Sequence, residues 1–315
     1  MTENFDKEKY IQECEDKLAD KFREIDRIAL FNQSKVCEAF AENRIAARHF
    51  AGTTGYGYGD EGRDCLGKVF AQAFGAEDGI VSPHILSGTH ALTVALFGLL
   101  RPGDILFCVS GMPYDTIRGV IHGDGNGSLK DFGIKFRCCD LVGDMFDYPA
   151  IKMGLAEAKV VYIQRSRGYE LRDAFSIDEI AEVCAFVREN GFKGCIFVDN
   201  CYGEFVETKE PTEVGADIIV GSLIKNPGGG LAQTGGYICG KAEYIDMIGK
   251  RLTAPSIGTE VGSHALGYQY YYQGFFMAPH TVAQALKCSL LIGEAMEGLG
   301  YKNYPPTDEL PHDIT

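Results

Sequence analysis

The chain has 315 residues, of which 45% are hydrophobic, so it can bury one large core or a large core and a smaller one. Its formal net charge of −14 argues against nucleic acid or an anionic membrane surface as a partner, because both favour basic faces.

The eleven cysteines are odd in number and irregular in spacing, and no Cys-x-x-Cys occurs. Several of them fall inside apolar runs, which is typical of reduced core thiols. Residues 1–9 are too charged for a signal peptide, and we find no apolar stretch long enough to span a bilayer. We therefore expect a cytosolic globular protein without disulfides.

Residues 1–50 predict a helical N-terminal arm. Apolar residues recur at helical spacing over 7–31, and Asn32 or Ser34 is placed to cap a second helix that reaches Ile45. Two amphipathic helices need a surface to pack on, and a lid on their own subunit is the simplest one.

A glycine-rich stretch, Thr53–Arg63, opens the main domain. Its Gly57-x-Gly59-x-x-Gly62 spacing formally matches the dinucleotide-binding fingerprint. The residues before it, 44–50, predict a helix and not the strand that this fingerprint requires. We therefore interpret the stretch as a connecting loop rather than a Rossmann motif.

Further along, extended residues 80–86 lead through Ser87-Gly88-Thr89-His90 into an apolar helix over 91–100. The free N–H groups and the positive dipole at the start of such a helix suit an anion. The same residues also suit an ordinary serine-capped helix. Both interpretations stay open for the motif alone, and the lysine described below favours a phosphate site.

Several short apolar runs predict buried strands that end in polar residues: 105–109, 159–164, 194–201, 217–222 and 236–240. A capping box at Ser176–Glu179 opens a helix that connects two of them, as in a parallel βαβ unit. The sequence thus predicts an α/β domain over 51–258, with a mostly parallel seven-stranded sheet flanked by helices. Residues 259–315 would begin a smaller C-terminal domain, with a helix starting near Thr259.

In such a sheet, ligands bind past the carboxyl ends of the strands. Asp199 follows one predicted strand, and Ser222 and Lys225 follow another. A lysine amine can react with the aldehyde of pyridoxal phosphate, a carboxylate can keep its pyridine nitrogen protonated, and a serine can bind its phosphate. This trio therefore predicts a pyridoxal-phosphate site.

The chain resembles the cysteine- and methionine-metabolism family of pyridoxal-phosphate enzymes. The likeness rests on Asp199-Asn200, Ser222-x-x-Lys225 and Ser87-Gly88-Thr89-His90-Ala91. Gly55–Asp64 and Gln164–Tyr169 are similar to its aluminium-resistance branch, whose members are also called cystathionine β-lyase-like. The resemblance covers about residues 31–315. It implies fold type I, a carbon–sulfur lyase acting on a sulfur-containing amino acid, and a homodimer or homotetramer.

The resemblance also implies roles for single residues. Ser87, Gly88, Thr89, Cys201 and Ser222 would contact the cofactor, whereas Tyr58 and Arg63 would reach the phosphate of the adjacent subunit. Tyr114 would stack on the pyridine ring and supply a proton, beside catalytic Lys225 and Asp199. Arg165 and Arg167 stand where most relatives have an asparagine; they would bind a substrate carboxylate or, equally, pair on the surface with Glu170 or Asp173.

Two further implications concern the ends of the chain. The N-terminal helices would clasp a neighbouring subunit, and the C-terminal small domain would be incomplete, with the substrate-clasping arginine outside it. We therefore expect this chain to hold the cofactor better than it turns over substrate.

Parts of the sequence also fit other functions. Ser222-x-x-Lys225 also fits penicillin-binding serine enzymes, but the Ser-Asp-Asn and Lys-Thr-Gly that accompany that pattern do not occur. A cofactor-binding protein without turnover, and a transaminase- or aldolase-type reaction, stay open. The seven histidines are scattered with no His-x-x-x-His spacing, so we expect no metal site.

Overall fold

The computed structural model describes residues 6–314, and its centre is a seven-stranded sheet in the order β1-β7-β6-β5-β4-β2-β3. The strands are β1 (Asp78–Ser82), β2 (Ile105–Cys108), β3 (Lys135–Cys138), β4 (Val160–Gln164), β5 (Cys195–Asp199), β6 (Ile218–Ser222) and β7 (Gly236–Gly240). Neighbours from β3 to β6 pair in parallel, and β7 pairs antiparallel with both β1 and β6. The predicted α/β class with a mostly parallel sheet is confirmed.

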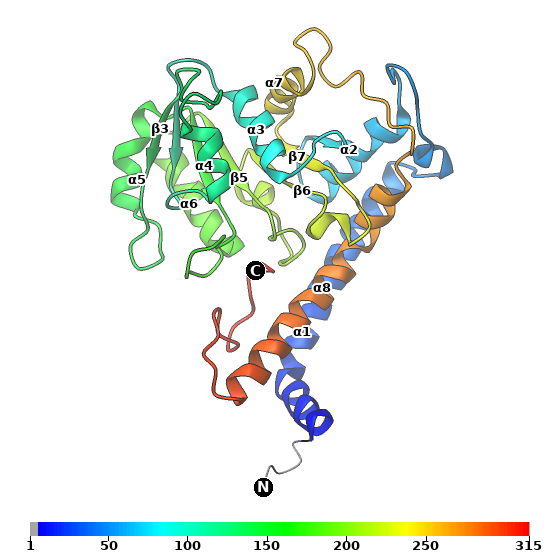
Figure 1. Ribbon diagram of the computed structural model, residues 1–315, viewed down its shortest axis with the longest axis vertical. Helices are drawn as coiled ribbons and strands as arrows, with labels where there is room; N and C mark the ends of the chain where they lie inside the picture. Colours follow the sequence, from blue (N-terminus) through cyan, green and yellow to red (C-terminus); the bar gives the residue numbers. More distant parts are fainter. Residues whose placement is uncertain (1–5, 315) are drawn as a thin grey trace.

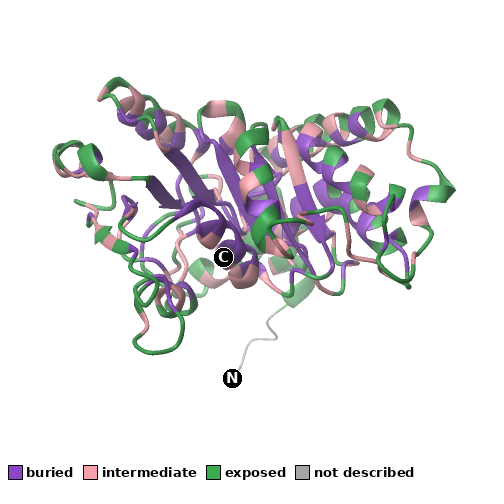
Figure 2. Ribbon diagram, turned by 90° about the horizontal axis from the view of Figure 1, so that it is seen from above, coloured by how far each residue is buried: buried purple, intermediate pink, exposed green. Residues whose placement is uncertain are grey.

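Helices cover both faces of the sheet, and Figure 2 shows the strands buried between them. One face carries α3 (Gly88–Leu99), α4 (Asp115–His122) and α7 (Ala242–Leu252). The other carries α2 (Glu61–Ala73), α5 (Tyr148–Gly154) and α6 (Ile177–Glu189). The central strands are buried on both faces and mainly apolar, apart from the polar residues with which they end. Short 3₁₀ turns, η1 (Ala47–Phe50), η2 (Leu155–Glu157), η3 (Pro211–Val214) and η4 (Asn226–Gly228), complete the fold.

Two long helices, α1 (Lys7–Glu42) and α8 (Gln269–Gly298), run side by side away from the sheet (Figure 1). The prediction of two N-terminal helices is wrong, since α1 is continuous. Asn32 is buried and donates to the Phe205 and Glu207 carbonyls, and the Ser34 hydroxyl donates to the Leu30 carbonyl. Neither side chain is therefore used as a cap.

The predicted helix start near Thr259 is also wrong, because α8 begins at Gln269. Gly258, Gly262 and Gly267 all have positive φ, which turns the intervening chain away from helix. By length and composition alone α8 could cross a membrane, contrary to our expectation that no stretch is long enough. Tyr272, Phe275 and other α8 residues instead pack into the core cluster that also holds α2, as in a core helix.

Candidate functional site

Several of the predicted site residues come from four elements, β5, β6, α3 and α4, that meet at one edge of the sheet. Asp199 ends β5, Ser222 ends β6, and Gly88 is the first residue of α3. A Cβ placed on Gly88 would lie 3.3 Å from both Ser222 Cβ and Cys201 Sγ. The first turn of α3 therefore packs directly against both strand ends, and glycine gives it the closest approach.

Asp199 is a buried carboxylate with two partners. Its Oδ1 accepts from the Cys201 N–H at 3.1 Å, and its Oδ2 accepts from the Tyr162 hydroxyl at 3.3 Å. Burial raises the pKa of Asp199, while the Lys225 charge opposes the rise. A carboxylate fixed in this way is positioned to hold a proton on a ligand.

Ser222 and Ser87 differ in how their hydroxyls are used. Ser87 caps α3, accepting from the His90 N–H at 3.1 Å, so the capping interpretation holds for its side chain. Ser222 is 1% exposed, and its Oγ has no hydrogen-bond partner within residues 6–314. An unpaired buried hydroxyl is costly, so a ligand oxygen would be a favourable partner for Ser222.

Tyr114 stands at the start of α4 and faces the same site. Its hydroxyl lies 3.0 Å from Thr89 Oγ1, and its N–H donates to Gln164 Oε1 at 2.9 Å. Burial, and then the Asp199 charge, raise the pKa of Tyr114. A phenol is protonated at neutral pH even at its ordinary pKa of about 10, so Tyr114 carries a proton that it can donate.

Lys225 follows β6 in the turn before η4. Its Nζ lies 3.9 Å from the centroid of the Tyr202 ring. Burial lowers the pKa of Lys225, but the nearby Cys201 thiol, Asp199 and Tyr202 outweigh burial and raise it overall. Burial also holds the pKa of Cys201 well above its usual range, so of these groups we assign the effect chiefly to Asp199.

The expectation that Arg165 contacts a substrate is wrong. Its side chain is completely buried and donates to Asn200 Oδ1, the Gly203 carbonyl and Glu207 Oε1. A surface pair between Arg165 and Glu170 or Asp173 is wrong as well, because the acidic partners of Arg165 are Glu207 and Glu210. Arg165 thus holds together the loops beneath the site.

Arg167 is turned toward the C-terminal segment. Its guanidinium donates to the Tyr304 carbonyl at 2.9 Å, and its N–H donates to Asp313. Its Nε has no hydrogen-bond partner among residues 6–314. A contact between Arg167 and a substrate stays a prediction.

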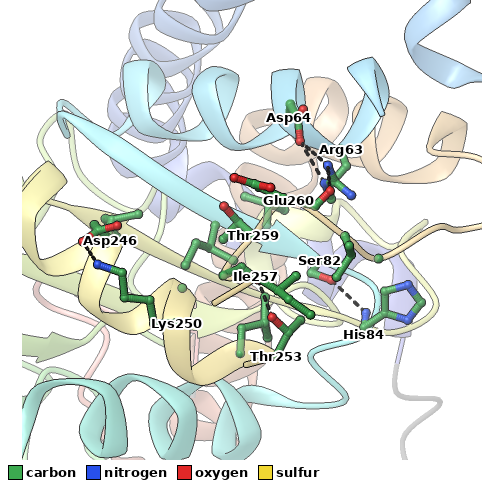
Figure 3. A pocket seen from close by; sticks show the side chains of 18 of the residues that line it. Arg63, Asp64, Ser82, His84, Asp246, Lys250, Thr253, Ile257, Thr259 and Glu260 are labelled. Carbon is green, nitrogen blue, oxygen red and sulfur yellow. Dashed lines mark hydrogen bonds and ion pairs between the residues drawn. The ribbon is translucent and has the colours of Figure 1, made fainter. Parts of the chain in front are cut away.

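The glycine-rich loop lies at a separate cavity of about 770 Å³, whose lining includes Arg63 but none of Asp199, Ser222 and Lys225. Figure 3 shows Arg63 paired with Asp64 beside this cavity. The guanidinium also donates to the Gly57 and Glu260 carbonyls. The Tyr58 side chain is exposed, so neither predicted phosphate contact joins the Lys225 site of its own chain.

Sequence reasoning missed four residues of the Lys225 site: Tyr162, Gln164, Tyr202 and Asn226. Tyr162 and Gln164 carried a usable signal, a hydroxyl and an amide within an apolar strand two residues apart. Tyr202 and Asn226 gave none, since their contacts come from the turns that follow β5 and β6. Within the described residues, no three histidine, cysteine or acidic side chains could hold a metal ion, and all eleven cysteines are free.

Three relatives illustrate what the chain is similar to. The uncharacterized protein YnbB of Bacillus subtilis (strain 168) is 46% identical over 311 residues, covering 97% of this chain and 74% of YnbB. A Listeria monocytogenes structure, provisionally described as a cystathionine beta-lyase involved in aluminum resistance, is 46% identical with a TM-score of 0.96. The match covers 98% of this chain and 77% of that one.

The third is a carbon–sulfur lyase involved in aluminum resistance from Clostridium novyi NT. It is 44% identical with a TM-score of 0.94, and the match covers 97% of this chain and 74% of that one. Residues 7–315, nearly the whole chain, match the family described as methionine gamma-lyase. The chain therefore belongs to the methionine gamma-lyase family.

Proposed function

We propose that this protein is a pyridoxal-phosphate-dependent carbon–sulfur lyase of fold type I, acting on a sulfur-containing amino acid in the cytosol. The observation that carries the proposal is the buried, unpaired Ser222 hydroxyl beside the first turn of α3, three residues before Lys225. Membership of the methionine gamma-lyase family supports the same chemistry.

The residues present fit the cofactor. Ser222 Oγ and the N-terminus of α3 would hold its phosphate, with Gly88 leaving room for close approach. Asp199 would bind the pyridine nitrogen, and Lys225 would bind the aldehyde. When bound, pyridoxal phosphate supplies an electron sink for the carbanion formed at the substrate Cα.

The chain's own groups would then move protons. The free amine of Lys225 takes the Cα proton, and the C–H electron pair stays on the substrate. Tyr114, a phenol that is protonated at neutral pH, gives a proton to the departing sulfur, which leaves with the electron pair of its bond to Cβ. For a sulfur on Cγ, a base must first remove a Cβ proton as well, and the sulfur then leaves with the electron pair of its bond to Cγ. The products are a thiol and an enamine that hydrolyses to a keto acid and ammonia.

The experiment is covalent trapping combined with an activity screen. Borohydride reduction of the loaded protein should leave the pyridoxyl group on Lys225, and peptide mapping would locate it. Cystathionine, methionine, homocysteine and cysteine should then be screened for thiol and keto-acid release. Label on Lys193, Lys209 or Lys241, or no label, would overturn the assignment.

The relation between subunits belongs to the same proposal. We propose a homodimer or homotetramer in which Tyr58 and Arg63 complete the site of a neighbouring copy. The support is that Arg63 lines a cavity to which Lys225 does not contribute, and that the Tyr58 side chain is exposed. We also propose an N-terminal arm over residues 1–50, a cofactor-binding domain over 51–258 and a smaller C-terminal domain over 259–315. Arg167 is proposed to contact the substrate carboxylate.

A further inference from the structure

Tyr202 is the aromatic residue against which the Lys225 amine lies. Its ring centroid is 3.9 Å from Lys225 Nζ, within the range of a favourable cation–π interaction. Its backbone has φ of +71°, a region that non-glycine residues seldom occupy. A tyrosine held in this conformation beside a reactive amine calls for a functional explanation.

Two side chains, those of Asn226 and Arg165, fix the turn that carries Tyr202. Asn226, the residue after Lys225, donates its side-chain amide to the Tyr202 carbonyl at 3.0 Å and to the Glu204 carbonyl at 2.9 Å. Buried Arg165 donates to the Gly203 carbonyl at 2.8 Å. These hydrogen bonds connect the turn that carries Lys225 to the turn that carries Tyr202, and so fix the distance between the Tyr202 ring and the Lys225 amine.

Other groups near Lys225 supply less negative charge at neutral pH than their number suggests. Burial raises the pKa of Cys201 well above its usual range and the pKa of Glu204 to about 8, so both are mainly neutral at pH 7. Asp199 is the remaining anion, and its carboxylate would be engaged with the pyridine nitrogen. The Tyr202 ring is then the neighbour best placed to stabilise a positive Nζ.

We propose that Tyr202 is a positioning residue that holds the Lys225 amine and stabilises it as an ammonium once it has taken the substrate's Cα proton. The inference rests on the proposed function. During this step the N–H bond forms, the C–H electron pair stays on the substrate, and positive charge develops on Nζ. Interactions that strengthen as charge develops accelerate the step.

Three substitutions separate the ring from the backbone strain. Tyr202→Phe keeps the ring and loses the hydroxyl, whereas Tyr202→Leu loses the ring. Tyr202→Asn also loses the ring but tolerates a positive φ better than leucine, so it guards against a folding defect. Tyr169→Leu is the matched control, because Tyr169 is 86% exposed.

The first readout is the pH dependence of Lys225 acetylation by trace acetic anhydride in the full chain without added cofactor. Tyr202→Leu and Tyr202→Asn should lower the apparent pKa of the amine by about 0.5–1.5, as expected for loss of a cation–π contact. Tyr202→Phe and Tyr169→Leu should match the native protein. An unchanged apparent pKa of the Lys225 amine in both Tyr202→Leu and Tyr202→Asn would overturn the proposal.

The second readout uses the loaded protein and whichever substrate the screen identifies. Loss of the ring should lower kcat by about 3- to 30-fold, leave KM nearly unchanged, and enlarge the isotope effect of a Cα-deuterated substrate. Equal kcat in native, leucine and asparagine proteins would refute the role. Failure to find pyridoxyl-Lys225 would refute the proposed function instead, and the acetylation result would still stand by itself.

Discussion

The two places where cofactor contacts were predicted are built in different ways. At the Lys225 site, residues from β5, β6, α3 and α4 converge, and Gly88, Cys201 and Ser222 pack within van der Waals reach. At the cavity beside α2, Arg63 bonds to its own neighbours at Gly57, Asp64 and Glu260. The exposed Tyr58 leaves its side chain free for another molecule.

The difference shows what a fold determines within one chain. Strand ends of a parallel sheet meet at one edge, so Asp199 and Ser222 become neighbours once β5 and β6 pair. The glycine-rich loop turns instead through positive φ at Gly55, Gly57 and Gly59, and most of its residues are exposed. A surface loop of this kind can serve a second copy of the chain.

The largest effect is expected at Lys225. Lys225→Ala removes both the covalent attachment and the base, so keto-acid release should fall about 1,000-fold or more. Borohydride should then label no residue. Lys193→Ala, at an exposed lysine on the same domain, is the matched control and should behave like the native protein. Retained visible absorbance with normal turnover in Lys225→Ala would show that the cofactor is not attached at the Lys225 site.

Beneath the Lys225 site, the two arginines after β4 should differ in stability rather than catalysis. Arg165→Met removes the guanidinium from buried Glu210 and from half-buried Glu207, which should cost about 3–5 kcal/mol of unfolding free energy. Arg167→Met loses one carbonyl contact and should cost about 1 kcal/mol. Urea denaturation of both proteins measures the contrast. A stable Arg165→Met with impaired substrate binding would restore the original prediction for Arg165.

Ser222 tests the phosphate assignment. Removal of a hydroxyl that binds a charged oxygen should weaken cofactor binding about 10- to 100-fold. Equilibrium titration of Ser222→Ala with pyridoxal phosphate, followed by visible absorbance, gives the number. Ser34→Ala, on the exposed side of α1, serves as the control. Equal affinity in both variants would mean that the buried hydroxyl has another partner.

Glu204, close to the Lys225 site, should make the free energy of unfolding depend on pH. It is completely buried, accepts from the Tyr237 hydroxyl at 2.8 Å, and burial raises its pKa to about 8. The pKa of Glu204 is higher in the folded protein than in the unfolded one, so the stability that protonated Glu204 contributes is fully present below about pH 4.5. It is lost as the pH rises through about 8.

Between these limits the slope should be on the order of 1 kcal/mol per pH unit. Glu204→Gln mimics the protonated acid and keeps an oxygen for Tyr237, so this loss should disappear. Unfolding free energies at pH 5, 7 and 8.5 would show it. The exposed Glu189→Gln should keep the native slope. A native slope in Glu204→Gln would assign the pH dependence to other groups.

The same contrast explains which features were predictable. Apolar runs with polar ends were sufficient to place β4, β5 and β6, and hence Asp199, Ser222 and Lys225 at one edge. Arg165 was assigned wrongly because a charged residue that follows a strand is expected to face the ligand. Its actual partners, Asn200 and Glu207, lie 35 or more residues away in the sequence and could not be known from it. The break predicted within α1 and the helix start predicted near Thr259 were wrong for a related reason. Asn32 and the turns at Gly258–Gly267 are explained by tertiary contacts and backbone angles, which residue identity alone does not give.

The smallest effect, and the most informative one, is expected at Arg63. Arg63→Ala loses bonds to two backbone carbonyls and to the exposed Asp64, so it should cost about 1–2 kcal/mol of unfolding free energy. It should weaken cofactor binding about tenfold. In a mixed oligomer with Lys225→Ala chains, each Arg63→Ala chain keeps its own lysine and receives the partner's native arginine. Titration of the isolated mixed oligomer should then recover native affinity at those lysines. Affinity that stays weak would place Arg63 in the site of its own chain, because a cis contact cannot be repaired by a partner.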